Sequence, residues 1–135
     1  MVKKSPSGAS SPYYYKNGQL DPIHYGSYFH DMAGLADMMA QEEQYILKGY
    51  GGRRILIDVY DTCFTGEMLG RLAGHLTAIS GKVTKLAFHG FSKKQAKQLE
   101  GCLKKTGCAL AGKIGYYSDM EEAKTWLISE PFQAG

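Results

Sequence analysis

A chain of 135 residues has the length of one domain and can bury a hydrophobic core of its own. Its 44% hydrophobic and 21% charged residues are ordinary for a globular protein, and a net charge of +3 is too small to indicate nucleic-acid binding without a concentrated basic patch. No apolar run approaches the roughly 18 residues that a membrane-spanning helix needs. The three cysteines, Cys63, Cys102 and Cys108, lack CxxC spacing, which indicates reduced thiols in a cytoplasmic protein.

The first twelve residues are rich in Ser, Gly and Pro and lack the apolar segment of a signal peptide. We expect a disordered leader at residues 1–12, followed by a single domain at residues 13–135. Residues 13–15 are tyrosines, and the turn dipeptide Asn17-Gly18 follows them. A short strand can therefore pair back with residues 19–22, and Pro22 is expected to end that pairing.

Apolar residues at three- and four-residue steps predict a helix over residues 27–48, with Ser27 capping its start. The helix contains Met32, Met38 and Met39. Such methionines are more often part of a core than of a pocket. They also suit adaptable apolar contacts, so a ligand groove or a lipid-facing surface stays open.

Three further strands are predicted at residues 54–60, 83–89 and 113–117, and each is followed by a helix. Ser92 with Gln95 forms a capping-box pattern at the start of one helix, and Ser118 with Glu121 forms another. Because a helix joins each strand to the next, the three strands should be parallel and covered by helices. The residues expected to face inward from these helices are Leu69, Leu72, Leu76, Ile79, Ala96, Leu99, Leu103, Ala123, Trp126 and Leu127.

The carboxyl ends of parallel strands collect functional groups, and here they are residues 61–65, 89–92 and 116–119. The stretch DTCFTGEMLGRL begins at the first of these ends. Thr65 fits the N-cap of the helix that follows, with its hydroxyl accepting a hydrogen bond from the amide near Glu67 or Met68. The alternative is that Thr65 is phosphorylated, since a phosphate is favourable at the start of a helix.

Other chemistries have weaker patterns. Cys63 at a helix start could be a nucleophile activated by His89, but no third orienting group is evident. A phosphatase loop of the C-x5-R type requires arginine where Leu69 stands, and no P-loop occurs. The four histidines (His24, His30, His75 and His89) are scattered, so we expect neither a metal nor a cofactor. The lysines at 93, 94, 97, 104 and 105 predict a solvated helix face or, alternatively, contact with an acidic partner.

The segments ILIDVYDTCFTGEMLGRL, KVTKLAFHGFS and GYYSDMEEAKTWL resemble a STAS-type domain of the SpoIIAA-like branch over residues 54–129. The resemblance implies a parallel or mixed sheet flanked by helices and no enzymatic activity. Members of the wider group act as anti-sigma-factor antagonists, anion-transporter appendages or stressosome parts. Their switch is a D-x-S-G motif with a phosphorylated serine. By that spacing Thr65 stands at the phosphoacceptor, and Cys63 stands where the aspartate belongs.

The SpoIIAA-like branch commonly lacks this switch and is similar to CRAL-TRIO lipid-binding domains. That similarity implies binding of an apolar ligand or association with a membrane, with the N-terminal helix as a mobile cover.

We therefore predict a cytoplasmic, non-enzymatic regulatory module that acts through a protein partner, with no cofactor and no nucleic acid. The predicted interaction surface, which includes Thr62 and Thr65 as candidate phosphoacceptors, is Asp61, Thr62, Thr65, Glu67, Met68, His89 and Ser92. The alternative is a carrier or sensor of an apolar small molecule or lipid with peripheral membrane association, using Met32, Leu35, Met39 and Leu69. A thiol enzyme using Cys63 is a third hypothesis. A homodimer is a further candidate state, because small domains of this fold often self-associate.

Overall fold

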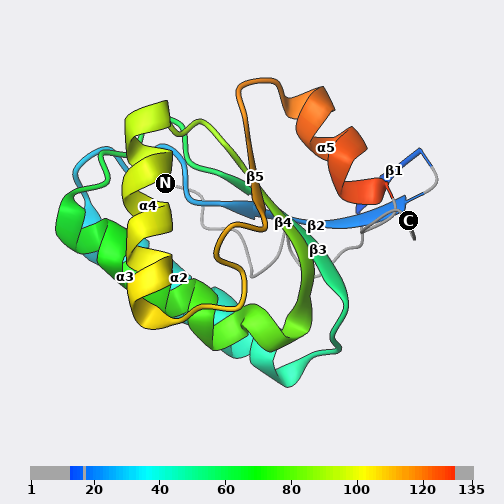
Figure 1. Cartoon of the computed structure of the whole chain (residues 1–135), viewed down its shortest axis with the longest axis horizontal. Coiled ribbons are helices and arrows are strands. Elements are labelled where there is room, and N and C mark those ends of the chain that lie inside the picture. Colours follow the sequence, from blue (N-terminus) through cyan, green and yellow to red (C-terminus); the bar gives the residue numbers. More distant parts are fainter. Residues whose placement is uncertain (1–12, 17, 130–135) are drawn as a thin grey trace.

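The computed structural model describes residues 13–16 and 18–129, which form one sheet with helices on both of its faces (Figure 1). The predicted α/β class, with a largely parallel, mixed sheet flanked by helices, is confirmed. The strands are β1 (Tyr13–Tyr15), β2 (Gly18–His24), β3 (Arg53–Asp58), β4 (Val83–His89) and β5 (Ile114–Tyr117). The helices are α2 (Met32–Lys48), α3 (Gly66–Ile79), α4 (Lys93–Thr106) and α5 (Met120–Ile128), with a short 3-10 turn, η1 (Ser80–Lys82), after α3. The predicted leader, residues 1–12, lies outside the described residues.

The strands lie side by side in the order β1-β2-β3-β4-β5, the same order as in the sequence. β1 is antiparallel to β2, whereas β2, β3, β4 and β5 are parallel. The predicted parallel arrangement of the last three strands is therefore confirmed, and β2 extends it by one strand. Helices α2, α3 and α4 supply the three crossovers that these parallel neighbours require.

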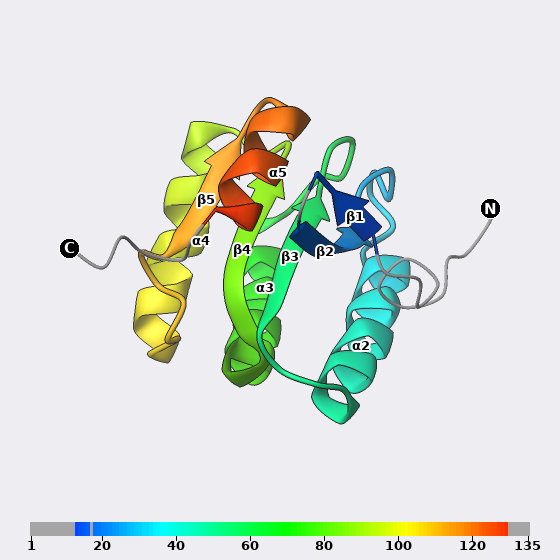
Figure 2. The same ribbon diagram turned by 90° about the vertical axis from the view of Figure 1, so that its right-hand side faces the viewer.

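The helices form two layers around the sheet (Figure 2). α2, α3 and α4 cover one face, and α5 lies on the other. Strand β3 is buried on both faces, because Ile55 and Ile57 belong to the larger core and Leu56 to the smaller one. The larger core joins Ile23, Ile55, Ile57, Leu86 and Phe88 to Leu35, Leu69, Leu72, Leu99 and Leu103. The smaller core joins Leu20, Leu56 and Ala87 to Ala123 and Leu127 of α5.

The pairing of β1 with β2 is brief, as expected, but it already ends at Leu20, and β2 itself continues through Pro22 to His24. β1 pairs with β2 only from Gly18 to Leu20, and from Asp21 onward β2 pairs with β3. Pro22 therefore lies where β2 has become an edge of the described sheet, and a residue without an N–H is tolerated at such an edge.

Helix α2 begins at Met32 rather than at Ser27, and its N-cap is Asp31, whose Oδ1 accepts from the Gly34 amide at 2.9 Å. Ser27 has a φ of 65°, so it does not cap a helix. Residues 25–29 are instead bound to the segment that follows β3, where the backbone amide of Tyr25 donates to Asp58 and that of Ser27 donates to Tyr60, both at 2.8 Å. These bonds between distant segments displace the helical start that the local pattern predicts.

The caps of α3 and α4 agree with the sequence. Thr65 Oγ1 accepts from the Met68 amide at 3.1 Å, and Ser92 with Gln95 forms the predicted capping box. The second predicted capping box is wrong, because Asp119 is the N-cap of α5 and no side chain caps it. The opposite end of α5 is bound instead: Lys85 Nζ of β4 donates to the Trp126 carbonyl at 2.6 Å, where a cation also complements the helix dipole.

Candidate functional site

A backbone ladder joins two loops at the carboxyl edge of the sheet. The amide of Phe29 donates to the Asp61 carbonyl at 2.9 Å, and the amide of Cys63 donates to the Phe29 carbonyl at 2.8 Å. The hydroxyl of Thr62 donates to the Tyr25 carbonyl at 2.7 Å and accepts from the Tyr28 amide at 3.0 Å. These four hydrogen bonds hold the loop that precedes α2 and the loop that precedes α3 together along their length.

Three residues of this ladder have left-handed backbone conformations. The φ angles are 65° at Ser27, 51° at Phe29 and 54° at Asp61. A bulky residue such as phenylalanine rarely adopts this conformation, which costs on the order of 1–3 kcal/mol at each position. The surrounding hydrogen bonds hold this strain, and strain of this kind clusters at functional sites.

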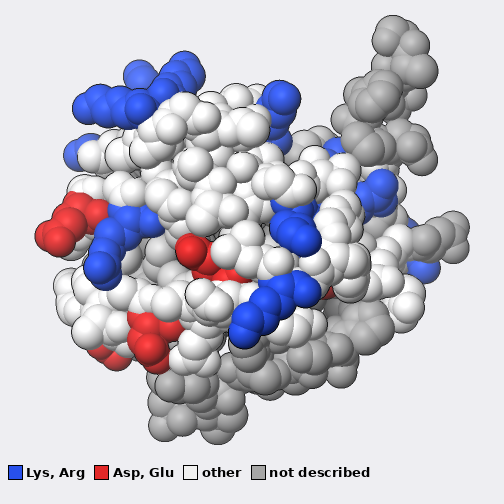
Figure 3. All heavy atoms as spheres, turned by 90° about the horizontal axis from the view of Figure 1, so that it is seen from below, with Lys and Arg blue, Asp and Glu red and all other residues white. Residues whose placement is uncertain are grey.

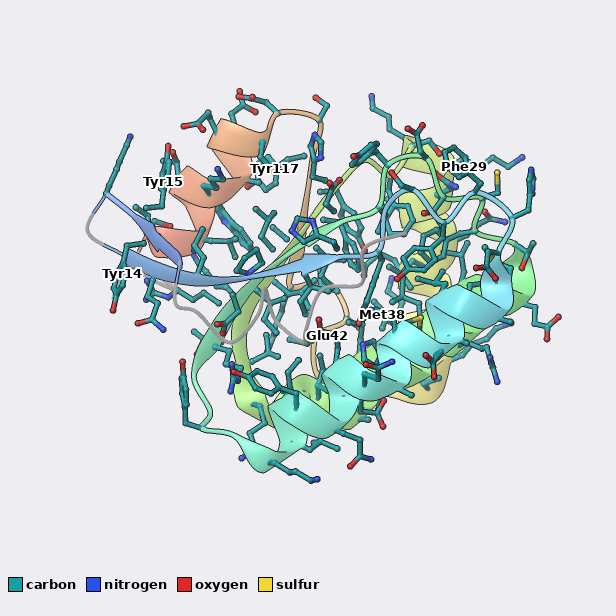
Figure 4. All side chains as sticks on the ribbon, turned by 180° about the vertical axis from the view of Figure 1, so that it is seen from behind. Tyr14, Tyr15, Phe29, Met38, Glu42 and Tyr117 are labelled. Carbon is teal, nitrogen blue, oxygen red and sulfur yellow. The ribbon has the colours of Figure 1, made fainter. Side chains whose placement is uncertain are left out.

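The strained segment presents two aromatic side chains to solvent. Phe29 is 58% exposed and Tyr60 is 47% exposed, although both follow closely on buried strands. Figure 4 shows Phe29 at the opposite end of the sheet from Tyr14. Sequence reasoning missed both residues: Phe29 fell inside a predicted helix and Tyr60 inside a predicted strand. The exposure of Phe29 depends on a ladder between segments some thirty residues apart, and no local pattern carries that signal.

The predicted interaction surface is only partly exposed. Asp61, Thr65, Glu67 and Ser92 are exposed, and His89 is half-buried. Thr62 and Met68 are buried, so their predicted place on an accessible surface is wrong. Thr62 is buried because its hydroxyl is part of the ladder, and Met68 because it packs in the larger core.

The side chain of His89, another predicted interaction residue, lies on the α5 face of the sheet. Side chains two residues apart share one face of a strand, so His89 shares the α5 face of the sheet with Ala87. Its Nδ1 lies 3.0 Å from Asp58 Oδ1. Cys63 Sγ is instead 3.7 Å from His30 Nε2, so the histidine in contact with this exposed thiol is not the one that the sequence suggested.

The residues predicted to bind an apolar ligand lie between α2, α3 and the sheet. Leu35 and Leu69 are 0% and 1% exposed and belong to the larger core. Met39 borders a hollow of about 200 Å³ between α2 and α3, and Met32 borders a separate one of about 160 Å³. The structure therefore divides these four residues between packed core and two small hollows.

A buried chain of hydrogen bonds also crosses from α2 to the sheet. Tyr25 Oη lies 2.8 Å from His75 Nε2, and His75 Nδ1 lies 3.0 Å from Glu43 Oε1. An ionised Glu43 can only accept, so Nδ1 carries the proton and Nε2 accepts from Tyr25. Burial lowers the pKa of His75, opposed by its hydrogen bond to Glu43, and burial raises the pKa of Tyr25 well above its usual range. Both groups are therefore neutral near pH 7.

The lysines of α4 at positions 93, 94, 97, 104 and 105 are all exposed, as a solvated helix face requires. In the view from below, several basic side chains gather at the upper left margin, and others are spread over the same face beside acidic ones (Figure 3). Among residues 13–16 and 18–129, no group of three or more His, Cys, Asp or Glu side chains is placed to hold a metal ion. No helix in this part of the chain has the length and apolar character to cross a membrane.

Comparison of the chain with protein-family models, with curated proteins and with solved structures gave no match.

Proposed function

We propose that this protein is a non-enzymatic binding module of the STAS, SpoIIAA-like type that acts through a protein partner in the cytoplasm. The partner docks on a surface that we call the edge surface, made of Phe29, Tyr60, Asp61, Thr65 and Glu67. The α/β fold with a mostly parallel sheet is consistent with this class. The edge surface keeps Asp61, Thr65 and Glu67 from the interaction surface that the sequence predicts, leaves out Ser92, and adds two exposed aromatic side chains.

The observation that carries the proposal is the exposed and strained Phe29. Leaving a large apolar side chain 58% exposed forgoes the stabilisation that burial brings, and its φ of 51° adds backbone strain. Both terms oppose folding and are offset by the ladder. Aromatic side chains that are held rigidly in solvent are typical of interface cores, because they bury much area and lose little conformational entropy on binding.

The chemistry of the partner follows from what surrounds the aromatic rings. Asp61 and Glu67 are exposed carboxylates on the same edge. They favour a partner that places a basic side chain next to an apolar pocket, since complementary charges steer association and fix orientation. Thr65 is exposed at the N-terminus of α3, so a phosphate there would add about −1.5 to −2 charges to this surface.

The test is quantitative affinity isolation of the tagged protein from its own cells. Phe29→Ser combined with Tyr60→Ser should lower recovery of the partner at least tenfold. Tyr14→Ser is the matched control, because Tyr14 is also a tyrosine in solvent, 68% exposed, at the other end of the sheet. Thermal unfolding of each variant separates lost binding from lost folding.

Two results would contradict the proposal. The first is full recovery of every partner by the Phe29→Ser, Tyr60→Ser variant. The second is unchanged binding in both Thr65→Glu and Thr65→Ala, which would remove Thr65 from the contact.

A further inference from the structure

The last residues of the four parallel strands are polar or aromatic, and they are paired with one another in a row across the sheet. His24 of β2 is paired with Asp58 of β3, Asp58 with His89 of β4, and His89 with Tyr117 of β5. Residues in register across a sheet share a face, and Leu56, two positions before Asp58, packs against α5. The row therefore lies on the α5 face of the sheet, and Figure 4 shows Tyr117 beside α5.

A hollow of about 230 Å³ adjoins this row between the sheet and α5. It is lined by residues of the sheet and of α5, which are Pro22, Ile23, His24, Leu56, Asp58, Met120 and Lys124. The volume is below the roughly 300 Å³ at which sites for drug-sized ligands begin, so it suits a molecule of amino-acid size.

Asp58 has one carboxylate oxygen bound and the other open. Its Oδ1 accepts from His89 Nδ1 at 3.0 Å and from the Tyr60 amide at 3.4 Å. No described residue donates to Oδ2, although the Asp58 side chain is only 9% exposed. Among the described residues, no fully buried side-chain oxygen lacks a partner, so Oδ2 keeps some accessible surface, and Asp58 is one of the residues that line the hollow. An open carboxylate oxygen in a mostly buried side chain calls for a strong donor such as an ammonium group.

Lys124 supplies the opposite charge to the same hollow. Its Nζ lies 3.9 Å from Glu121 Oε2 and 5.6 Å from the centre of the Tyr15 ring. The Glu121 side chain is 67% exposed, and an ion pair this exposed contributes only about 0–1 kcal/mol. The carboxylate of a ligand can therefore compete with Glu121 for the Lys124 ammonium group.

We infer that this hollow binds a small apolar α-amino acid. The ammonium group donates to Asp58, the carboxylate pairs with Lys124, and the apolar side chain lies over Pro22, Leu56 and Met120. His89 acts as a positioning residue, because its bond to Oδ1 fixes the orientation of the Asp58 carboxylate. Asp58, Lys124 and the hollow lie on the α5 face, so this site and the edge surface can be tested separately.

The first experiment titrates the full chain, labelled with ¹⁵N, with three compounds of the same carbon skeleton. L-leucine carries both charges, 3-methylbutylamine lacks the carboxylate, and 4-methylpentanoate lacks the ammonium group. We expect leucine to shift the amide signals of β2, β3 and α5 and to bind at least tenfold more tightly than either analogue. No binding of leucine at millimolar concentrations, or equal binding of all three compounds, overturns the inference.

The second experiment assigns the two charges. Lys124→Gln should weaken leucine at least tenfold and leave 3-methylbutylamine unchanged, whereas Lys94→Gln on α4 should change neither. Asp58→Asn should weaken leucine at least tenfold, and Asp61→Asn should not. If Asp58→Asn fails to fold, the test rests on Lys124→Gln alone. An equal loss of affinity for leucine and for 3-methylbutylamine in that variant contradicts the assignment. Loss of the edge-surface partner in Phe29→Ser, Tyr60→Ser leaves these titrations unaffected.

Discussion

At the scale of single residues, Gly90, which follows β4, combines a positive φ with a close approach of backbone atoms. Its φ is 114°, and an added Cβ would lie 2.8 Å from the Tyr60 amide nitrogen and 3.1 Å from the Tyr60 Cα. Backbone atoms cannot yield as a flexible side chain can. Gly90 therefore lets the loop after β4 pass against the loop that carries Tyr60, and the geometry of the edge surface depends on it.

Gly90→Ala should destabilise the protein by at least 1–3 kcal/mol, because it combines backbone strain with a steric clash. Gly74→Ala is the matched control, since Gly74 lies within α3 and nothing is within 4 Å of an added Cβ. That change should stabilise the protein by about 0.5–1 kcal/mol through helix propensity. Urea unfolding measures both, and a Gly90→Ala variant as stable as Gly74→Ala would contradict the expectation.

His75 makes the stability of the protein depend on pH. Burial lowers its pKa in the folded state below the ordinary value of 6.5. Below pH 6.5 the unfolded chain therefore binds a proton that the folded chain does not, and stability falls by up to about 1.4 kcal/mol for each pH unit. Above pH 6.5 both states hold His75 neutral, and the stabilisation is fully present.

His75→Gln should flatten this dependence, because glutamine can bond both Tyr25 and Glu43 without titrating. The measurement is the free energy of unfolding in urea at pH 7.5, 6.5 and 5.5. His30→Gln is the control, because it replaces an exposed histidine in the same way. Parallel curves for His75→Gln and the wild type would assign the pH dependence to other groups.

At the scale of elements, the ladder joins the loops before α2 and α3. It occupies residues that the sequence pattern assigned to the first turn of a helix starting at Ser27. Thr62 contributes most of its side-chain bonding, since one hydroxyl serves both Tyr25 and Tyr28. Removing that hydroxyl leaves a carbonyl and an amide without their partner in a place where water has little access. The ladder is thus a structural unit that Thr62 closes.

Thr62→Val keeps the shape of the side chain and removes both bonds, so it should destabilise the protein by about 1–3 kcal/mol. Thr84→Val is the matched control, because Thr84 is exposed on β4 and should shift stability by less than about 0.5 kcal/mol. Hydrogen exchange of the Tyr28 amide should accelerate in Thr62→Val alone. Equal exchange rates in the two variants would show that the hydroxyl does not hold the loop.

At this scale, the sequence predicted interactions between residues close together in the chain and missed those between distant segments. The caps at Thr65 and Ser92 were predictable because the hydroxyl and the amide it binds are three residues apart. The place of Thr62, Phe29 and Tyr60 was not, because it depends on bonds between segments some thirty residues apart. The cap expected at Ser118 does not form, because Asp119 is the N-cap of α5 and makes no side-chain cap bond.

At the scale of the whole molecule, the alternation of strands and helices was enough to predict the α/β class, because parallel neighbouring strands require helical crossovers. The candidate sites were harder to predict. The sequence placed functional groups at the carboxyl edge of the sheet, where the edge surface lies. It did not pair Asp58 with His89 or set them against α5, because register between strands is fixed only when the sheet assembles.

The strand order, identical to the order in the sequence, has a consequence for how the chain is made. Each new strand can join an edge that already exists as the polypeptide leaves the ribosome, with no strand held open for a later insertion. Helix α5 comes last, so Leu20, Leu56 and the largely buried Lys85 stay in water until it docks. Until then, the nascent protein exposes a half-covered sheet, which is the surface a chaperone would recognise.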